Sequence, residues 1–315
     1  MRHPYGLILA AALSWGVAGC ERCPETFVSL DQLVCEYNAN AAAVPRLWAR
    51  ANIAVTMADE KGRTFKWGST SPLASPNGLL LMQKGDNPLG PHDFVLIGRE
   101  AGSKLFQTGS SIADGVYYLW LRLGDRGGAW WGRQELAAAP GVDALPIDPN
   151  QILALLGVFE LPTDFTHPPT VALAMSSDPC AYVVTYLDRQ PITNRLLFRR
   201  EVYFHWSDSK PRRPYKVNLF AADGRRVMTA YLKNYKSIAA EDADCAAVMP
   251  SDIRIEWIRW PGLDSPVRSL RLVISEMTTA PKGNPPAAAR FWDNLPGGLD
   301  QTQVDSGLTK KGNPE

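Results

Sequence analysis

Short segments of β-strand composition, separated by Gly, Pro, Asn and Asp, fill most of this chain and restrict its fold more than any other feature. A first series predicts strands over 49–57, 63–69, 78–84, 93–100, 103–110, 115–123 and 128–134. A second series predicts strands over 170–176, 180–187, 196–206, 215–221, 225–235, 252–260, 269–277 and 289–295. Because little helix separates consecutive strands, we expect antiparallel meanders and not parallel crossovers.

Two helical patterns accompany the strands. Ser29 and Gln32 form a capping box before an amphipathic stripe that ends near Pro45. Asp148 and Pro149 begin a second helix, whose body over 152–161 is apolar on nearly all sides and must therefore be buried. Two helices cannot cover both faces of so many strands. The sequence predicts a mainly β, α+β fold in which helices lie on the concave face of a strongly curved antiparallel half-barrel sheet.

The N-terminus has the pattern of a secretory signal peptide: Arg2, an apolar run over 7–18, and small residues before Cys20. Val17-Ala18-Gly19-Cys20 resembles the lipobox of bacterial lipoproteins, which implies lipidation of Cys20 and cleavage before it. An ordinary signal peptide with a chance cysteine is the alternative. By analogy with lipoprotein sorting in enterobacteria, Glu21 rather than Asp after the lipidated cysteine implies the periplasmic face of the outer membrane and not the inner membrane.

These patterns divide the chain into four parts. We expect a signal peptide over 1–19, a lipidated cysteine with its tether over 20–28, one domain over 29–300, and a disordered tail over 301–315. Cleavage removes one of 33 basic residues and leaves 32 basic against 32 acidic residues. A chain so close to neutral gives no indication of a nucleic-acid partner.

Signatures of catalysis are absent from the sequence. It contains no G-x-S-x-G elbow, H-E-x-x-H pair, Walker loop or G-x-G-x-x-G turn. His92, His167 and His205 are interpreted as loop or surface residues, because catalytic or metal-binding use would require them to converge in space. We therefore expect a non-enzyme without catalytic residues, metal site or cofactor.

Four cysteines remain after Cys20, and an exported chain favours disulfides. Pairing of Cys23 with Cys35 and of Cys180 with Cys245 is the favoured arrangement. Free thiols or another pairing remain open, and a bond between Cys23 and Cys180 would contradict the favoured one.

Large apolar side chains on the predicted strands and on the second helix are candidates for the lining of a lipid cavity. They are Trp120, Trp130, Trp131, Ile152, Leu155, Leu156 and Phe159. An ordinary β core, or anchoring of tryptophans in a membrane interface, would explain the same residues.

Residues 189–236 hold twelve basic and three acidic side chains in an otherwise neutral protein. Arg199, Arg200, Arg212 and Arg213 are candidates for a patch that binds anionic headgroups or a membrane surface. Solvated strand faces neutralised by acids of neighbouring strands are the alternative.

The order of elements over residues 29–300 resembles the LolA/LolB-type lipoprotein-localisation factors and related lipid carriers. The resemblance rests on LDQLVCEYNANAA running into VPRLWARANIAV, on GVYYLWL, on the hairpin VNLFAADGRRVMTAYL and on the closing ARFWDNLPGGLDQ. It implies an open half-barrel with helices as a lid over a cavity for acyl chains. The gating arginine of the soluble carriers has no fixed counterpart here, with Arg50 and Arg99 only candidates.

The resemblance and the lipobox together predict a monomeric envelope lipoprotein anchored in the membrane. It would bind acyl chains or a lipidated partner beneath the helix over 149–161, without catalysis. An envelope scaffold or sensor with a packed, ligand-free half-barrel is the alternative.

Overall fold

A computed structural model defines the architecture of the chain. The structure describes residues 23, 27–58, 61–71, 75–87, 91–123, 126–137, 145–166, 170–189, 196–206, 212–221, 223–239, 247–258, 267–279, 291–292 and 295–306. The predicted signal peptide, Cys20, His167 and Cys245 lie outside these residues.

Strands dominate the described residues and agree with the predicted segments to within a few residues. The first half contains β1 (Arg46–Ala58), β2 (Thr64–Gly68), β3 (Gly78–Gln83), β4 (Asp93–Glu100), β5 (Ser103–Ser111), β6 (Val116–Leu123) and β7 (Arg126–Arg133). The second half contains β8 (Thr170–Ser177), β9 (Cys180–Arg189), β10 (Leu196–His205), β11 (Pro214–Phe220), β12 (Arg226–Ser237), β13 (Val248–Trp257), β14 (Val267–Thr278) and β15 (Gln301–Gln303).

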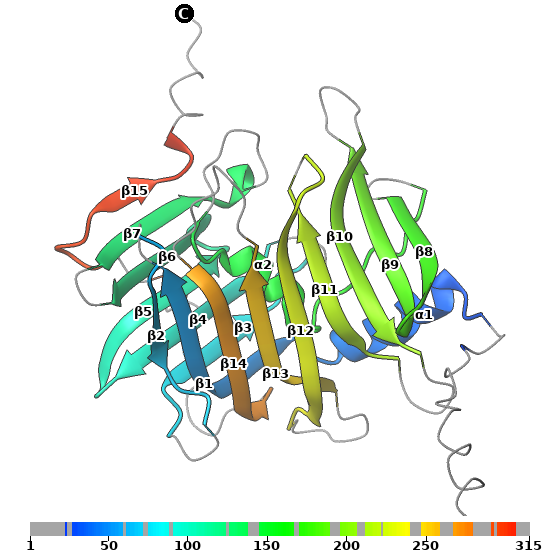
Figure 1. Cartoon of the computed structure of the whole chain (residues 1–315), viewed down its shortest axis with the longest axis horizontal. Helices are drawn as coiled ribbons and strands as arrows, with labels where there is room; N and C mark the ends of the chain where they lie inside the picture. The colour runs from blue at the N-terminus through cyan, green and yellow to red at the C-terminus, as the bar shows by residue number, and fades with distance from the viewer. Residues whose placement is uncertain are drawn as a thin grey trace, which may run out of the picture.

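All strands belong to one large, curved and open sheet (Figure 1). Its order is β15-β7-β6-β5-β4-β3-β1-β14-β13-β12-β11-β10-β9-β8, with β2 paired to the second part of β1. Consecutive strands form antiparallel meanders, as predicted, and the two meanders join where β1 pairs with β14. The pairing of β15 with β7 is parallel.

Both helices lie on one side of the sheet, behind the strands in Figure 1. Helix α1 (Leu30–Ala42) is capped by Ser29, whose Oγ accepts a hydrogen bond from Gln32 N at 3.2 Å. Helix α2 (Pro149–Leu155) packs on β4, β5 and β6. A single turn of 3₁₀ helix, η1 (Gln134–Leu136), follows β7. The predicted half-barrel with helices on its concave face is therefore confirmed.

Helix α2 is shorter than the predicted helix over 149–161. It ends at Leu155, and Gly157 then takes a positive φ of 72°, a left-handed conformation that glycine adopts without steric cost. The apolar residues beyond it, Val158 and Leu161, are buried without being helical. The segment after the helix is apolar because it also enters the core, and its composition therefore resembles a continuation of the helix.

One large apolar cluster fills the helix side of the sheet, with contributions from both helices and from strands of both halves. Two smaller clusters lie on the opposite face of the first half. Leu81, Val95 and Ile97 pack with Phe291, while Tyr118, Trp120 and Ala129 pack with a later segment that includes Trp292 and Leu299. Strands β3, β4, β6 and β7 of the first half are thus covered on both faces.

The C-terminal boundary predicted at residue 300 is wrong. Residues 301–303 form β15, and Val304 and Asp305 are buried. Asp305 Oδ2 accepts hydrogen bonds from the backbone and the side chain of Arg133. Residues 307–315 lie outside the described part. A strand is also predicted over 289–295. The structure describes Phe291 and Trp292 in the middle of this segment, and neither residue belongs to a strand.

The cap of α2 yields a prediction about pH. Burial raises the pKa of Asp148 to about 6, although hydrogen bonds from the backbone of Asn150 and Gln151 favour its ionised form. The folded chain therefore holds this proton more tightly than the unfolded chain, and stability is lost as the pH rises from about 4 to above 6. Asn caps helices as well as Asp does but carries no charge. Urea unfolding should show that Asp148→Asn improves stability more at pH 7.5 than at pH 4, by on the order of 1–3 kcal/mol. An equal effect at both pH values would contradict this assignment.

Candidate functional site

A mostly apolar pocket of about 290 Å³ lies between α1 and the sheet. Helix α1 contributes Glu36, Tyr37, Ala39 and Asn40 to its lining, and its C-cap residue Ala43 adds to them. The facing side is formed by Gly157 after α2, the start of β11 and parts of β12 and β13: Arg212, Arg213, Pro214, Tyr235, Ala247 and Val248. The pocket combines apolar walls with Arg212 and Arg213, two arginines of the predicted headgroup patch.

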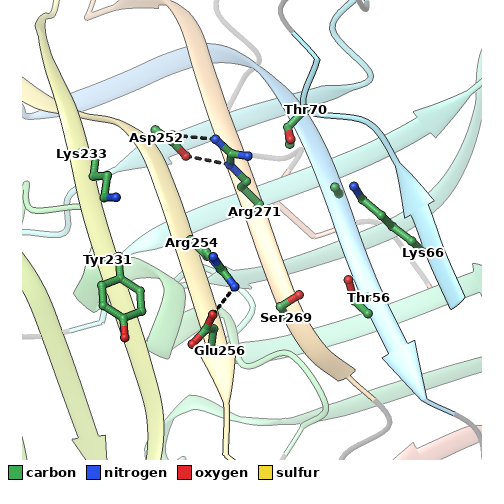
Figure 2. Close-up of a pocket in the computed structure, with 11 residues that line it drawn as sticks. Thr56, Lys66, Thr70, Tyr231, Lys233, Asp252, Arg254, Glu256, Ser269 and Arg271 are labelled. Atoms are coloured by element: carbon green, nitrogen blue, oxygen red, sulfur yellow. Dashed lines mark hydrogen bonds and ion pairs between the residues drawn. The ribbon is translucent and has the colours of Figure 1, made fainter. Parts of the chain in front are cut away.

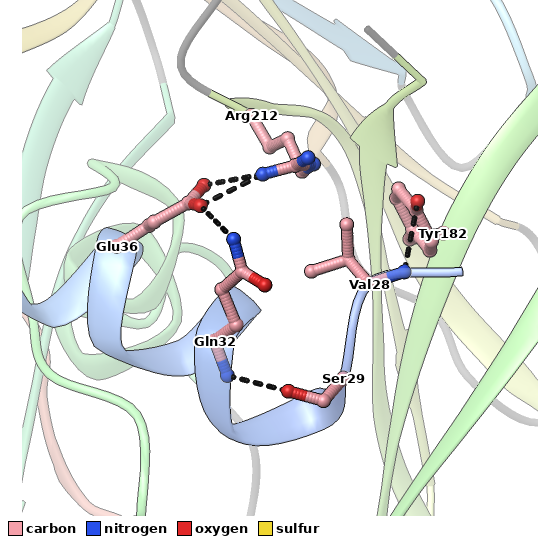
Figure 3. Close-up of polar contacts among 6 residues, drawn as sticks. All are labelled: Val28, Ser29, Gln32, Glu36, Tyr182 and Arg212. Atoms are coloured by element: carbon pink, nitrogen blue, oxygen red, sulfur yellow. Dashed lines mark hydrogen bonds and ion pairs between the residues drawn. The ribbon is translucent and has the colours of Figure 1, made fainter. Parts of the chain in front are cut away.

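Arg212 connects the pocket to the first half of α1 (Figure 3). Its Nη1 lies 2.7 Å from Glu36 Oε1 and 2.9 Å from Oε2, and Gln32 donates a further hydrogen bond to the same carboxylate. The guanidinium also lies over the ring of Tyr182, at 5.9 Å from its centroid. The hydroxyl of Tyr182 accepts a hydrogen bond from Val28 N just before the helix. The start of α1 is therefore fastened to β9 and to the residues that precede β11.

Arginine over tyrosine recurs on the neighbouring strands. Arg213 lies over Tyr235 at 5.3 Å, and Arg200 lies over Tyr186 at 4.6 Å. Burial raises the pKa of Tyr235 well above its usual value, and Arg213 opposes that shift. Three arginines of one local region are thus held on aromatic faces, an arrangement that stabilises a partly desolvated cation.

Several buried polar atoms in this region have no hydrogen-bond partner within the described chain. They are Arg212 Nε, Arg213 Nε, Trp206 Nε1 and Tyr186 Oη. An unsatisfied buried donor costs about 1–3 kcal/mol. The two guanidinium donors belong to residues that line the pocket, so an anionic group placed there would gain charge-assisted hydrogen bonds.

Two asparagines hold α1 over the pocket, because each side-chain amide both donates to and accepts from the backbone of one residue. Asn38 donates to Leu161 O at 2.9 Å and accepts from Leu161 N at 2.8 Å. Asn40 makes the same two bonds with Val248, at 2.9 and 2.8 Å. Lys84 Nζ, in addition, donates to Ala41 O at 2.6 Å. These polar contacts hold the C-terminal half of α1, in addition to its buried apolar residues Leu33, Val34 and Ala41.

The predicted headgroup residues are only partly brought together. Arg212 and Arg213 border the pocket, and Arg200 lies on β10 over Tyr186. The side chain of Arg199 lies outside the described residues.

The predicted cavity residues separate onto the two faces of the sheet. Ile152, Leu155 and Leu156 belong to the large helix-side cluster, and Trp130 and Phe159 pack against it. Phe159 also stacks on His92 at 4.4 Å. Trp120 and Trp131 lie on the other face, in the cluster with Tyr118. The prediction that Trp120 and Trp131 line a cavity on the helix side is wrong. Successive residues of a strand point to opposite faces, so Leu119 and Trp130 face the helices while Trp120 and Trp131 face away from them.

None of the predicted cavity residues lines the α1 pocket. Its apolar walls come from Tyr37 and Ala39 of α1, from the C-cap residue Ala43, and from Tyr235 and Ala247. The sequence signal that could have found this site is the pair Asn38 and Asn40, polar residues in the turn that continues the buried stripe of α1.

The favoured disulfide pairing is also wrong. Cys23 is bonded to Cys180, with the Cα atoms 5.6 Å apart, while Cys35 is a free, exposed thiol. The bond joins the segment before α1 to the first residue of β9, across 157 residues of sequence. Cys35 lies on the face of α1 that is turned to solvent, so it does not reach Cys23.

The described histidines do not converge. His92 is buried beside Phe159 just before β4, whereas His205 stacks on Tyr215 at the end of β10, and six strands lie between β4 and β10 in the sheet order. Among the described residues no group of three His, Cys, Asp or Glu side chains is arranged to hold a metal ion. Within the same residues no helix has the length and apolar character needed to span a bilayer.

Comparisons with known proteins identify similar shapes only. No protein-family profile matches the sequence, and no curated protein does so significantly. A crystal structure from Vibrio parahaemolyticus, described as an outer membrane lipoprotein-sorting protein domain, superposes with a TM-score of 0.44 at 11% identity, over 78% of this chain and 90% of the other. A LolA superfamily protein from Nitrosomonas europaea gives 0.42 at 13%, over 80% and 93%. A DUF1329 family protein from Desulfovibrio piger gives 0.42 at 9%, over 78% and 92%.

The attachment of α1 yields a prediction about stability. Replacing Asn38 by Ala removes both bonds to Leu161, a residue that is only 3% exposed, and leaves its N–H and C=O without partners. We expect a loss of about 2–3 kcal/mol in urea unfolding, with faster amide exchange in α1. Cys35→Ala, at an exposed position of the same helix, is the matched control and should change stability by less than about 0.5 kcal/mol. Equal effects of the two substitutions would show that the asparagine does not hold the helix.

Proposed function

We propose that this protein is an envelope lipoprotein that binds an acyl chain of an anionic lipid, or of a lipidated protein, in the α1 pocket and performs no chemistry on it. The observation that carries the proposal is the combination of apolar walls with two arginines whose buried Nε donors lack partners. Apolar walls accommodate methylene groups, at about 0.8 kcal/mol for each one buried. The arginines accommodate the phosphate or carboxylate at the end of the chain.

Access to the pocket would occur along α1. Leu155 and Leu156 of the α2 region are fully buried in the large cluster, so moving α2 would expose the core itself. Helix α1 itself covers the pocket, so a shift of its C-terminal half, which breaks the bonds of Asn38 and Asn40, would open the pocket directly. The lid proposed here is therefore α1, in place of the helix expected from the sequence.

Membrane anchorage through Cys20 is part of the proposal. Cys23 is bonded to Cys180, so only two residues would separate the lipidated Cys20 from this bond to the folded domain. The Cα atoms of Cys20 and Cys23 can therefore lie at most about 11 Å apart. Val28, Tyr182 and Arg212 connect this attachment point to the rim of the pocket. The pocket would therefore open near the bilayer, on the periplasmic face of the outer membrane, where lipid enters and leaves.

A second candidate function is an envelope scaffold or sensor with a packed half-barrel. It is favoured by the large cluster that fills much of the helix side of the sheet, including all the predicted cavity residues of α2. The two candidates differ in whether the isolated domain takes up lipid.

Lipid uptake is tested on the chain from residue 21 onward, exported behind a cleavable signal peptide without the lipobox. After incubation with palmitoyl-oleoyl-phosphatidylglycerol, native mass spectrometry should show one bound lipid that organic extraction removes. Ala39→Leu narrows the pocket while keeping helix propensity nearly unchanged, and should reduce the bound fraction several-fold. Ala42→Leu, at an exposed position of α1 outside the pocket lining, should bind like the parent. A bare polypeptide under all conditions would favour the scaffold.

Anchorage is tested separately in the full chain. Cys20→Ser should abolish lipidation and move the protein from the membrane fraction to the periplasmic fluid, because the acyl chains on this cysteine are the proposed anchor. Labelling with tritiated palmitate and fractionation measure both effects. Cys35→Ser controls for the loss of a thiol and should leave the protein in the membrane. Retention of the Cys20→Ser protein in the membrane would refute the anchor.

A further inference from the structure

A second hollow, of about 470 Å³, lies on the outer face of the sheet, opposite the helices. Figure 2 shows its lining, which comes from five strands, β12, β13, β14, β1 and β2, and from Thr70 after β2. On each strand the lining residues alternate with core residues, as Arg254 does with buried Ile253 and Ile255. The hollow is therefore separated from the α1 pocket by the whole thickness of the sheet.

The depression arises from small side chains between large ones. In one row across the sheet Tyr231 faces Arg254, Arg254 faces Arg271, and Arg271 faces Ala54. In the next row Glu256 faces Ser269, Ser269 faces Thr56, and Thr56 faces Lys66. The floor at Ala54, Thr56 and Ser269 is low, while long side chains border it.

Positive charge is in excess within the hollow. Arg254 and Arg271 stand directly opposite each other, a destabilising placement for like charges. Each is partly compensated by a carboxylate: Arg271 holds Asp252 through bonds of 3.0 and 2.8 Å, and Arg254 lies 2.6 Å from Glu256. Both carboxylates of the lining are thereby used.

Two lysines of the lining have no polar partner within the part of the chain that the structure describes. Lys66 on β2 and Lys233 on β12 make no hydrogen bond or ion pair with the described residues, and they border the hollow from opposite sides (Figure 2). Four strand spacings separate their strands, which is about 19 Å. Four cations against two carboxylates leave an excess of two positive charges, spread along a line that crosses the strands.

The geometry points to a binding site for an acidic oligosaccharide, a sugar chain that carries several carboxylates. The line of cations suits an extended ligand with repeated negative charges. Hydroxyl groups of Thr56, Thr70 and Ser269 line the same floor and match the hydroxyls of sugars. Stable protein interfaces depend on a desolvated centre with apolar anchors, and here only Tyr231 and Ala54 have such character.

Calorimetric titration with tetragalacturonate at 25 mM and 150 mM salt tests the proposal. The parent chain should bind it, and binding should weaken at the higher salt concentration because the contacts are ionic and exposed. Lys66→Gln with Lys233→Gln should raise Kd at least tenfold. Lys236→Gln, an exposed lysine of the same strand β12 outside the hollow, is the matched control and should change Kd by less than twofold.

Four results would overturn the proposal: no binding of tetragalacturonate at millimolar concentration, equal binding of the uncharged maltotetraose, an unchanged Kd in the double lysine variant, or equally tight binding of a twelve-nucleotide single strand. The last result would assign the hollow to polyanions in general. Because the hollow and the α1 pocket lie on opposite faces, Ala39→Leu should leave tetragalacturonate binding unchanged, so failure of one site leaves the other testable.

Discussion

The pairing of β1 with β14 is the interaction on which the rest of the structure depends. It runs from Trp48 opposite Thr278 to Met57 opposite Val267 and joins segments more than 200 residues apart in the sequence. Without it, each meander would end in an exposed edge at this position. With it, fourteen strands follow one another in a single order, and both helices come to lie on the same concave face.

The two faces of this sheet have opposite chemistry, and each candidate site lies where the packing of its face is incomplete. On the helix side, one apolar cluster is interrupted beside α1, where the arginines meet aromatic rings. On the outer side, residues of the C-terminal segment cover the first half, while the described outer residues of β12–β14 form charged rows. An amphiphile suits the first place and a water-soluble anion suits the second.

Strand positions could be predicted closely because runs of β-strand composition are bounded by Gly, Pro, Asn and Asp. Errors occurred where that signal was absent or ambiguous. β15 has only three residues, too few to show a period. β6 is buried on both faces, so Tyr117 and Leu119 could not be distinguished from Trp120 by composition. The end of α2 was placed too late because Val158 and Leu161 are buried without being helical.

The sequence by itself determined the class of fold, the bounds of most strands, the caps of both helices and the absence of familiar catalytic motifs, since these depend on residues a few positions apart. Only the tertiary structure decided the Cys23–Cys180 bond, the pocket beneath α1 and the charged hollow, because each brings together residues from strands distant in the chain. Local propensity constrains neither which strands become neighbours nor which face of a doubly buried strand meets the helices. Those choices follow from burying the most apolar surface over the whole sheet at once.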